Sequence, residues 1–196
     1  SPEALTVLKT MLKDRHPKVR RAVVEALGEF KTPDAASILL TAFRRERSYT
    51  IRAQAIRSLA RTGDPRVRQA IAQALKTPSW IEMIRAAAVD ATATLDGRVA
   101  SILPFAAYGQ PTQVRLAAIR QLARLGKGDP KITDLLFTFA DEASDFISVA
   151  ALTALGKLGD PTAVERLKKI VSDDIGSRNR AFADRAVRVI RMGLKT

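Results

Sequence analysis

The chain repeats a short segment about every 32 residues, and this period constrains the fold more than any other feature of the sequence. Four copies open with a β-branched residue followed by arginine: Val19-Arg20, Ile51-Arg52, Ile84-Arg85 and Val114-Arg115. A fifth copy opens with Ile147-Ser148, where serine replaces the arginine. Each copy continues with apolar residues at helical spacing and ends near a glycine, and a sixth, more divergent copy ends near Gly193. A fixed period of this length is typical of stacked helical repeats.

A second apolar helix is expected to precede each of these segments, over residues 2–13, 34–45, 65–76, 98–108, 130–141 and 161–172. Several begin at a capping side chain followed by proline, whose fixed φ suits the first helical turn. Ser79 and Glu82 have the spacing of a capping box. One such helical pair cannot bury its apolar stripe alone, so neighbouring pairs must stack. The sequence therefore predicts an all-α fold, an α-solenoid of about six helical pairs.

Composition narrows the function classes. The chain carries 33 basic and 20 acidic residues, a formal charge of +13, with no cysteine and one histidine, His16. These counts exclude disulfides, thiolate nucleophiles and a two-histidine zinc site. We therefore expect no catalytic residue, metal or cofactor in residues 1–196. No window approaches the ~20 apolar residues of a membrane helix, and a membrane is not an expected partner.

Domain boundaries and targeting signals are not apparent in the sequence. No linker rich in glycine, serine or proline divides the repeats, so residues 1–196 are expected to form a single domain. The chain opens Ser1-Pro2-Glu3, without an initiator methionine or an apolar signal core. We interpret it as a C-terminal piece of a longer protein, and its compartment is not indicated.

The period, the Asp-Pro helix starts and the Val/Ile-Arg openings resemble HEAT repeats of the bacterial type over the entire chain. Residues 78–85, Pro-Ser-Trp-Ile-Glu-Met-Ile-Arg, and residues 108–111, Tyr-Gly-Gln-Pro, also resemble the C-terminal helical region of aminopeptidase N family zinc peptidases. In that family an HExxH helix and a downstream Glu hold the zinc, and a GxMEN loop binds the substrate amino terminus. Neither motif occurs here, so the resemblance implies an accessory region without catalytic residues.

The repeated arginines Arg20, Arg52, Arg85 and Arg115 allow two interpretations. They could form a row that binds phosphates. The resemblance to HEAT repeats favours a structural role, in which each arginine pairs with an acidic or carbonyl group of the adjacent turn. The row is also incomplete, because Ser148 occupies the fifth position.

Positions five and nine residues after the repeat arginine vary in charge between repeats. Residues four apart share a helix face, so Arg57 with Arg61 and Arg120 with Arg124 should each project together. We expect a basic concave surface with two separate positive stations, interrupted by Asp90. Its predicted members are Arg57, Arg61, Arg120, Arg124, Lys157 and Arg188. The alternative is a solvated helix face without a ligand.

The leading functional hypothesis is a non-catalytic scaffold that presents this surface to a protein or peptide, including the catalytic domain of its own chain in a zinc aminopeptidase. Nucleic-acid binding is the alternative, because a pI of about 10.7 is a typical electrostatic signature of such proteins. A HEAT-repeat enzyme of the bilin lyase or glycosylase type ranks last, since no catalytic constellation supports it.

Overall fold

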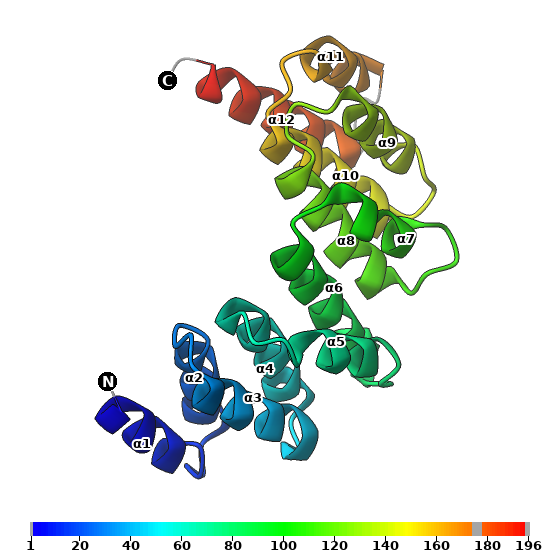
Figure 1. Ribbon diagram of the computed structural model, residues 1–196. Coiled ribbons are helices and arrows are strands. Elements are labelled where there is room, and N and C mark those ends of the chain that lie inside the picture. Colours follow the sequence, from blue (N-terminus) through cyan, green and yellow to red (C-terminus); the bar gives the residue numbers. More distant parts are fainter. Residues whose placement is uncertain (1, 174–177, 195–196) are drawn as a thin grey trace. The chain divides into compact units, whose positions relative to one another are not determined.

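The computed structural model describes residues 2–173 and 178–194, and every regular element within these ranges is a helix (Figure 1). The helices cluster into two compact units, Ser1–Ser101 and Ile102–Thr196. In each unit helical pairs stack on one another, so the predicted all-α fold, an α-solenoid, is confirmed. None of the described helices is long and apolar enough to cross a membrane. The single domain stays a prediction.

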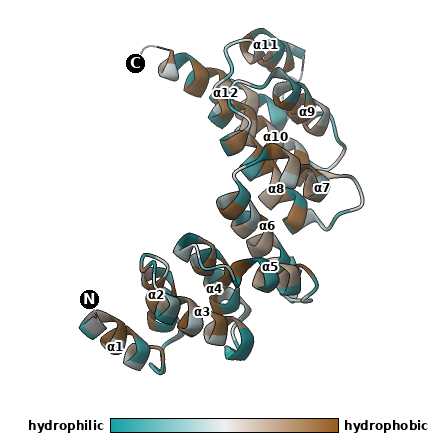
Figure 2. Cartoon of the chain, viewed as in Figure 1, coloured by the Kyte–Doolittle hydropathy of each residue, from teal (hydrophilic) through white to brown (hydrophobic). Residues whose placement is uncertain are grey.

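Unit 1 is built around α4. Its elements are α1 (Pro2–Met11), α2 (Pro17–Leu27), α3 (Pro33–Arg45), α4 (Tyr49–Thr62), α5 (Val67–Leu75), the 3-10 turn η1 (Trp80–Glu82), α6 (Met83–Asp96) and the 3-10 turn η2 (Val99–Ser101). Helix α4 packs against α2, α3 and α6, and Leu27, Phe43 and Ile56 are fully buried between them. Figure 2 shows hydrophobic and hydrophilic residues sharing the same helices, as burial of one face requires.

Unit 2 repeats this arrangement around α10. Its elements are α7 (Leu103–Ala106), α8 (Thr112–Leu125), α9 (Pro130–Ala140), α10 (Asp145–Leu158), α11 (Ala163–Asp173) and α12 (Arg178–Gly193). Helix α10 packs against α8, α9 and α12, with Leu122, Leu136 and Leu155 buried completely. Gly156 permits close packing, because a Cβ there would lie 3.1 Å from Cα of Ala186 in α12.

Two local predictions differ from the structure. The helix expected over 98–108 is split into η2 and the four-residue α7. Pro104 explains the break, since proline has no amide hydrogen to donate and its ring clashes with the carbonyl one turn earlier, so it is accepted only in the first turn of α7. The capping box of Ser79 and Glu82 does not form: Ser79 Oγ accepts from the Ile84 amide at 3.0 Å, and Glu82 pairs with Arg85.

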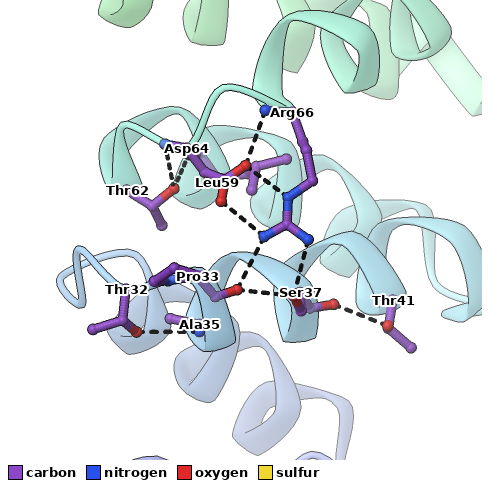
Figure 3. A network of polar contacts seen from close by, with 9 residues as sticks. All are labelled: Thr32, Pro33, Ala35, Ser37, Thr41, Leu59, Thr62, Asp64 and Arg66. Atoms are coloured by element: carbon purple, nitrogen blue, oxygen red, sulfur yellow. Dashed lines mark hydrogen bonds and ion pairs between the residues drawn. The ribbon is translucent and has the colours of Figure 1, made fainter.

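Polar contacts also link α3 and α5, the first helices of two consecutive helical pairs. Arg66, just before α5, pairs with Asp64 at 2.7 Å and donates to the Pro33 carbonyl and to Ser37 Oγ, both at 3.0 Å (Figure 3). The Asp64 carboxylate in turn accepts from the Arg66 backbone amide at 2.9 Å. The turn that begins α5 is thereby fixed to the first turns of α3.

Asp160 makes the corresponding contact in unit 2 and gives it a pH-dependent stability. The Thr133 hydroxyl, the Thr162 hydroxyl and the Thr162 amide donate to its carboxylate at 2.5, 2.7 and 2.9 Å. These bonds, that of Thr133 foremost, hold the pKa of Asp160 below its ordinary value of 3.8. The unfolded chain then takes up the proton more readily, so the stabilisation is complete above about pH 4 and is lost as the pH falls through the lowered pKa.

We expect the Asp160→Asn variant to lose less stability on acidification than the wild type, because it lacks this carboxylate. Urea denaturation between about pH 6 and pH 2 measures the difference. Asp141→Asn, at an exposed carboxylate, is the matched control and should follow the wild type. Parallel pH profiles of the Asp160→Asn variant and the wild type would show that Asp160 titrates normally.

Candidate functional site

The repeat arginines contact the turns beside them. Arg20 in α2 forms a two-pronged ion pair with Glu46, at 3.0 and 3.2 Å, and donates to the Asp14 carbonyl at 2.9 Å. This contact lowers the pKa of Glu46 through the Arg20 hydrogen bond. Arg52 in α4 donates to the Phe43 carbonyl at 2.8 Å, and its guanidinium lies 5.6 Å from the centre of the Phe43 ring.

Arg115 is the most buried of the four. Its side chain is 6% exposed, and its guanidinium pairs with both oxygens of Glu142, at 2.7 and 2.5 Å. It also donates to the Ala106 carbonyl at 3.0 Å. Arg85 differs, since its ion pair at 3.3 Å is with Glu82 of the preceding turn of its own segment. At Arg20, Arg52 and Arg115 the guanidinium is thus held by the protein itself.

The first predicted positive station is largely neutralised within unit 1. Arg57 pairs with Asp90 of α6 at 2.8 Å. Arg61 pairs with Glu29 after α2 at 3.2 Å and donates to the Glu25 carbonyl at 2.8 Å. Asp90, which was expected to interrupt the surface, is therefore the partner of one of its arginines, and Glu29 is the partner of the other. This differs from the prediction because the alternating charges of α2, α4 and α6 meet across their packed interfaces.

The second predicted station lies in a groove of unit 2. The C-terminal parts of α8 and α10 line a hollow of about 340 Å³, whose walls are Arg120, Gln121, Ala123, Arg124, Lys127 and Lys157. We call this the cationic groove. No carboxylate is among its lining residues. Arg124 Nε donates to Oε1 of Gln121 at 2.8 Å, so the two side chains contact each other along α8.

The cationic groove holds three of the six predicted surface residues, Arg120, Arg124 and Lys157, together with Lys127, which was not predicted. Lys127 belongs to the turn after α8, outside the helical face on which the prediction relied. The sequence Gly126-Lys127-Gly128 could have indicated this position, because it predicts a tight turn that holds the lysine close to the end of the preceding helix. Arg188 of α12 does not line the groove and pairs with Asp184, one turn earlier on its own helix.

Clusters of metal-ligating side chains are not found in the described part of the chain. No group of three or more His, Asp or Glu side chains there has the geometry to hold a metal ion. His16 caps α2, since its Nδ1 accepts from the Lys18 amide at 3.3 Å. The cationic groove is therefore the candidate site.

Comparisons with known proteins find one curated relative. A curated relative, the bilin biosynthesis protein PecE of Mastigocladus laminosus, is 31% identical over 153 residues, which are 76% of this chain and 55% of PecE. The chain thus spans about half the length of that relative. None of the relatives named here is a peptidase, so the resemblance to aminopeptidase N finds no support in them.

Solved structures resemble the chain at low identity. The complex of CpcE and CpcF of phycocyanin lyase from Nostoc sp. PCC7120 matches 95% of this chain and 94% of that chain, with 16% identity and a TM-score of 0.49. Human deoxyhypusine hydroxylase matches 98% of this chain and 86% of its own, with 14% identity and a TM-score of 0.47. The HEAT-repeat family matches residues 1–53, 39–104 and 99–188, nearly the full length, and the chain therefore belongs to the HEAT-repeat proteins.

Proposed function

We propose that this chain is a HEAT-repeat scaffold that binds an acidic segment of a protein partner in the cationic groove of unit 2. The observation that carries the proposal is the groove itself, where four cations line one hollow without a carboxylate. Arginine can hold a carboxylate through two parallel hydrogen bonds, and lysine adds point charge. An Asp- or Glu-rich segment supplies the complementary groups.

The dimensions of the groove favour a polypeptide over a nucleic acid. A duplex presents one phosphate charge per ~1.7 Å of axis and needs a series of cations along its length. The cationic groove holds its four cations in a volume of about 340 Å³, which suits one or two acidic side chains. In unit 1, the equivalent arginines are paired with Asp90 and Glu29, so the cations there do not form a continuous series.

The double variant Lys127→Gln/Lys157→Gln tests the proposal. Each lost surface contact costs about 0.5 kcal/mol, so binding of fluorescein-labelled polyglutamate should weaken about fivefold, measured by anisotropy. Both lysines are exposed and have no packing role, so the melting temperature should stay nearly unchanged.

The matched control removes two exposed lysines of unit 2 that lie outside the groove, in Lys131→Gln/Lys169→Gln. It should bind polyglutamate as the wild type does. Equal losses of affinity in both double variants would show that net charge, and not the groove, accounts for the effect. Duplex DNA that binds tightly at physiological salt, and loses affinity only in the groove variant, would favour the nucleic-acid alternative.

A role in bilin chemistry is a second candidate, favoured by the 31% identity to a bilin biosynthesis protein. Such a role ranked last on the sequence alone, which holds no catalytic constellation. The identity to this relative makes it a stronger candidate. A bilin carries two propionate carboxylates, which the same four cations could bind. Titration with biliverdin, followed by its visible absorption band, distinguishes the candidates. A saturable spectral shift that Lys127→Gln/Lys157→Gln weakens would support the bilin role, and no shift would contradict it.

A further inference from the structure

Unit 1 has a second surface that the cationic groove does not involve. The C-terminal ends of α2, α4 and α6 gather around one hollow, lined by Glu29, Arg61 and Leu95 among others. These helices therefore run in the same direction, and their N-terminal ends gather at the opposite edge of unit 1. The turns that join each first helix to its second helix lie along this edge (Figure 1). We call it the turn edge.

Two apolar side chains are exposed at the turn edge. Trp80 is 67% exposed and Ile81 is 48% exposed, and they follow one another in η1. Ile81 has φ 45° and Glu82 has φ 55°, both in the left-handed region that β-branched residues rarely adopt. This backbone turns the pair outward, although burial of both side chains would be favourable. Tyr49, at the start of α4, adds a second exposed aromatic ring on the neighbouring turn.

Four cations lie in or beside the same two inter-helix turns as these side chains. Arg44 and Arg45 end α3, Arg47 lies in the turn before α4, and Lys76 caps the C-terminal end of α5. All four are exposed. The nearby carboxylates do not offset them, because Glu46 is held by Arg20 and Glu82 by Arg85. The exposed charge of this part of the edge is therefore positive.

We propose that the turn edge of unit 1 is a docking surface for an acidic protein, with Trp80 and Ile81 as its apolar centre and Arg44, Arg45, Arg47 and Lys76 as its rim. Binding energy at protein interfaces concentrates in Trp, Tyr and Arg, the residue types gathered here. The rim charge selects an acidic partner and speeds its approach. A single strand of nucleic acid would require a series of stacking rings, and the described edge offers Trp80 and Tyr49. This surface is separate from the cationic groove and does not rest on it.

The sole tryptophan of the chain makes the test direct, because Trp80 emission reports on this edge alone. The probe is a random copolymer of glutamate and tyrosine, with polyglutamate for comparison. We expect the copolymer to shift Trp80 emission to the blue and to bind more tightly than polyglutamate. Arg44→Gln/Arg45→Gln/Arg47→Gln should weaken copolymer binding about tenfold. Ile81→Ser should weaken it severalfold at unchanged charge.

The matched control, Lys31→Gln/Arg98→Gln/Lys131→Gln, removes the same charge from exposed positions in the opposite turns and at the start of α9. It should bind the copolymer within about twofold of the wild type. Circular dichroism should show the same helix content in all variants. No blue shift, or equal weakening in the control, would overturn the proposal. A larger shift with vesicles of phosphatidylcholine and phosphatidylserine, or with duplex DNA, would assign the edge to a lipid surface or a nucleic acid instead.

Discussion

Replacing Arg115 with alanine is expected to lower the free energy of unfolding by about 3 kcal/mol. The variant removes a nearly buried cation and leaves the Glu142 carboxylate, 22% exposed, without the partner that binds both of its oxygens. The Ala106 carbonyl also loses its donor. Breaking a buried ion pair on one side costs more than the pair itself contributes, because the remaining charge stays desolvated. Urea denaturation followed by circular dichroism measures the loss.

Arg85→Ala is the matched control, since Arg85 holds the same repeat position in unit 1. Its ion pair with Glu82 spans 3.3 Å, and the two side chains are 33% and 27% exposed. Both side chains are partly exposed and the pair is longer than that of Arg115, so we expect a loss of less than about 1 kcal/mol. Equal losses in the two variants would mean that repeat position, rather than burial of the ion pair, sets the contribution of these arginines.

Phe43→Ala is expected to cost about 4 kcal/mol, the largest effect of any variant considered for unit 1. The ring is fully buried beneath α4, and its removal leaves a cavity and deletes the ring contact of Arg52. Phe146→Ala, whose ring is 70% exposed, should change stability by no more than about 0.5 kcal/mol. Trp80 emission and circular dichroism should both follow the unfolding of the Phe43→Ala variant.

These two readouts also test the predicted single domain. Trp80 lies in unit 1, whereas circular dichroism reports on helices of both units. One cooperative domain should give coincident midpoints by the two probes in the wild type and in Phe43→Ala. A fluorescence midpoint that falls while part of the circular dichroism transition stays in place would show that the units unfold separately. An unchanged midpoint in both would contradict the role of Phe43 in the core.

The sequence predicted the helices well because the period and the capping residues are local signals. Thr32 and Asp129 cap their helices through their side chains, as their position before proline indicated. The failure at 98–108 came from Pro104, whose effect on a short helix outweighed the apolar pattern.

The candidate site was harder to predict, because charge on a helix face does not reveal what lies opposite. Arg57 and Arg120 look alike in the sequence, yet Arg57 is paired with Asp90 while Arg120 lines the cationic groove. The register between neighbouring helices decides which side chains each arginine meets. Lys127 was missed for a related reason, since turns have no periodic face to follow.

The ion pairs of α4 also affect whether a repeat can be gained or lost in unit 1. Arg57 reaches forward to Asp90, whereas Arg61 reaches back to Glu29, so α4 meets acidic residues on both neighbours. A recombination event that duplicated this repeat would set two copies of Arg57 and Arg61 beside each other, and like charges would meet at the new junction. Deleting the repeat would instead bring Glu29 toward Asp90. The charges of α2, α4 and α6 therefore favour the present order of repeats in unit 1 over one with a repeat inserted or deleted there.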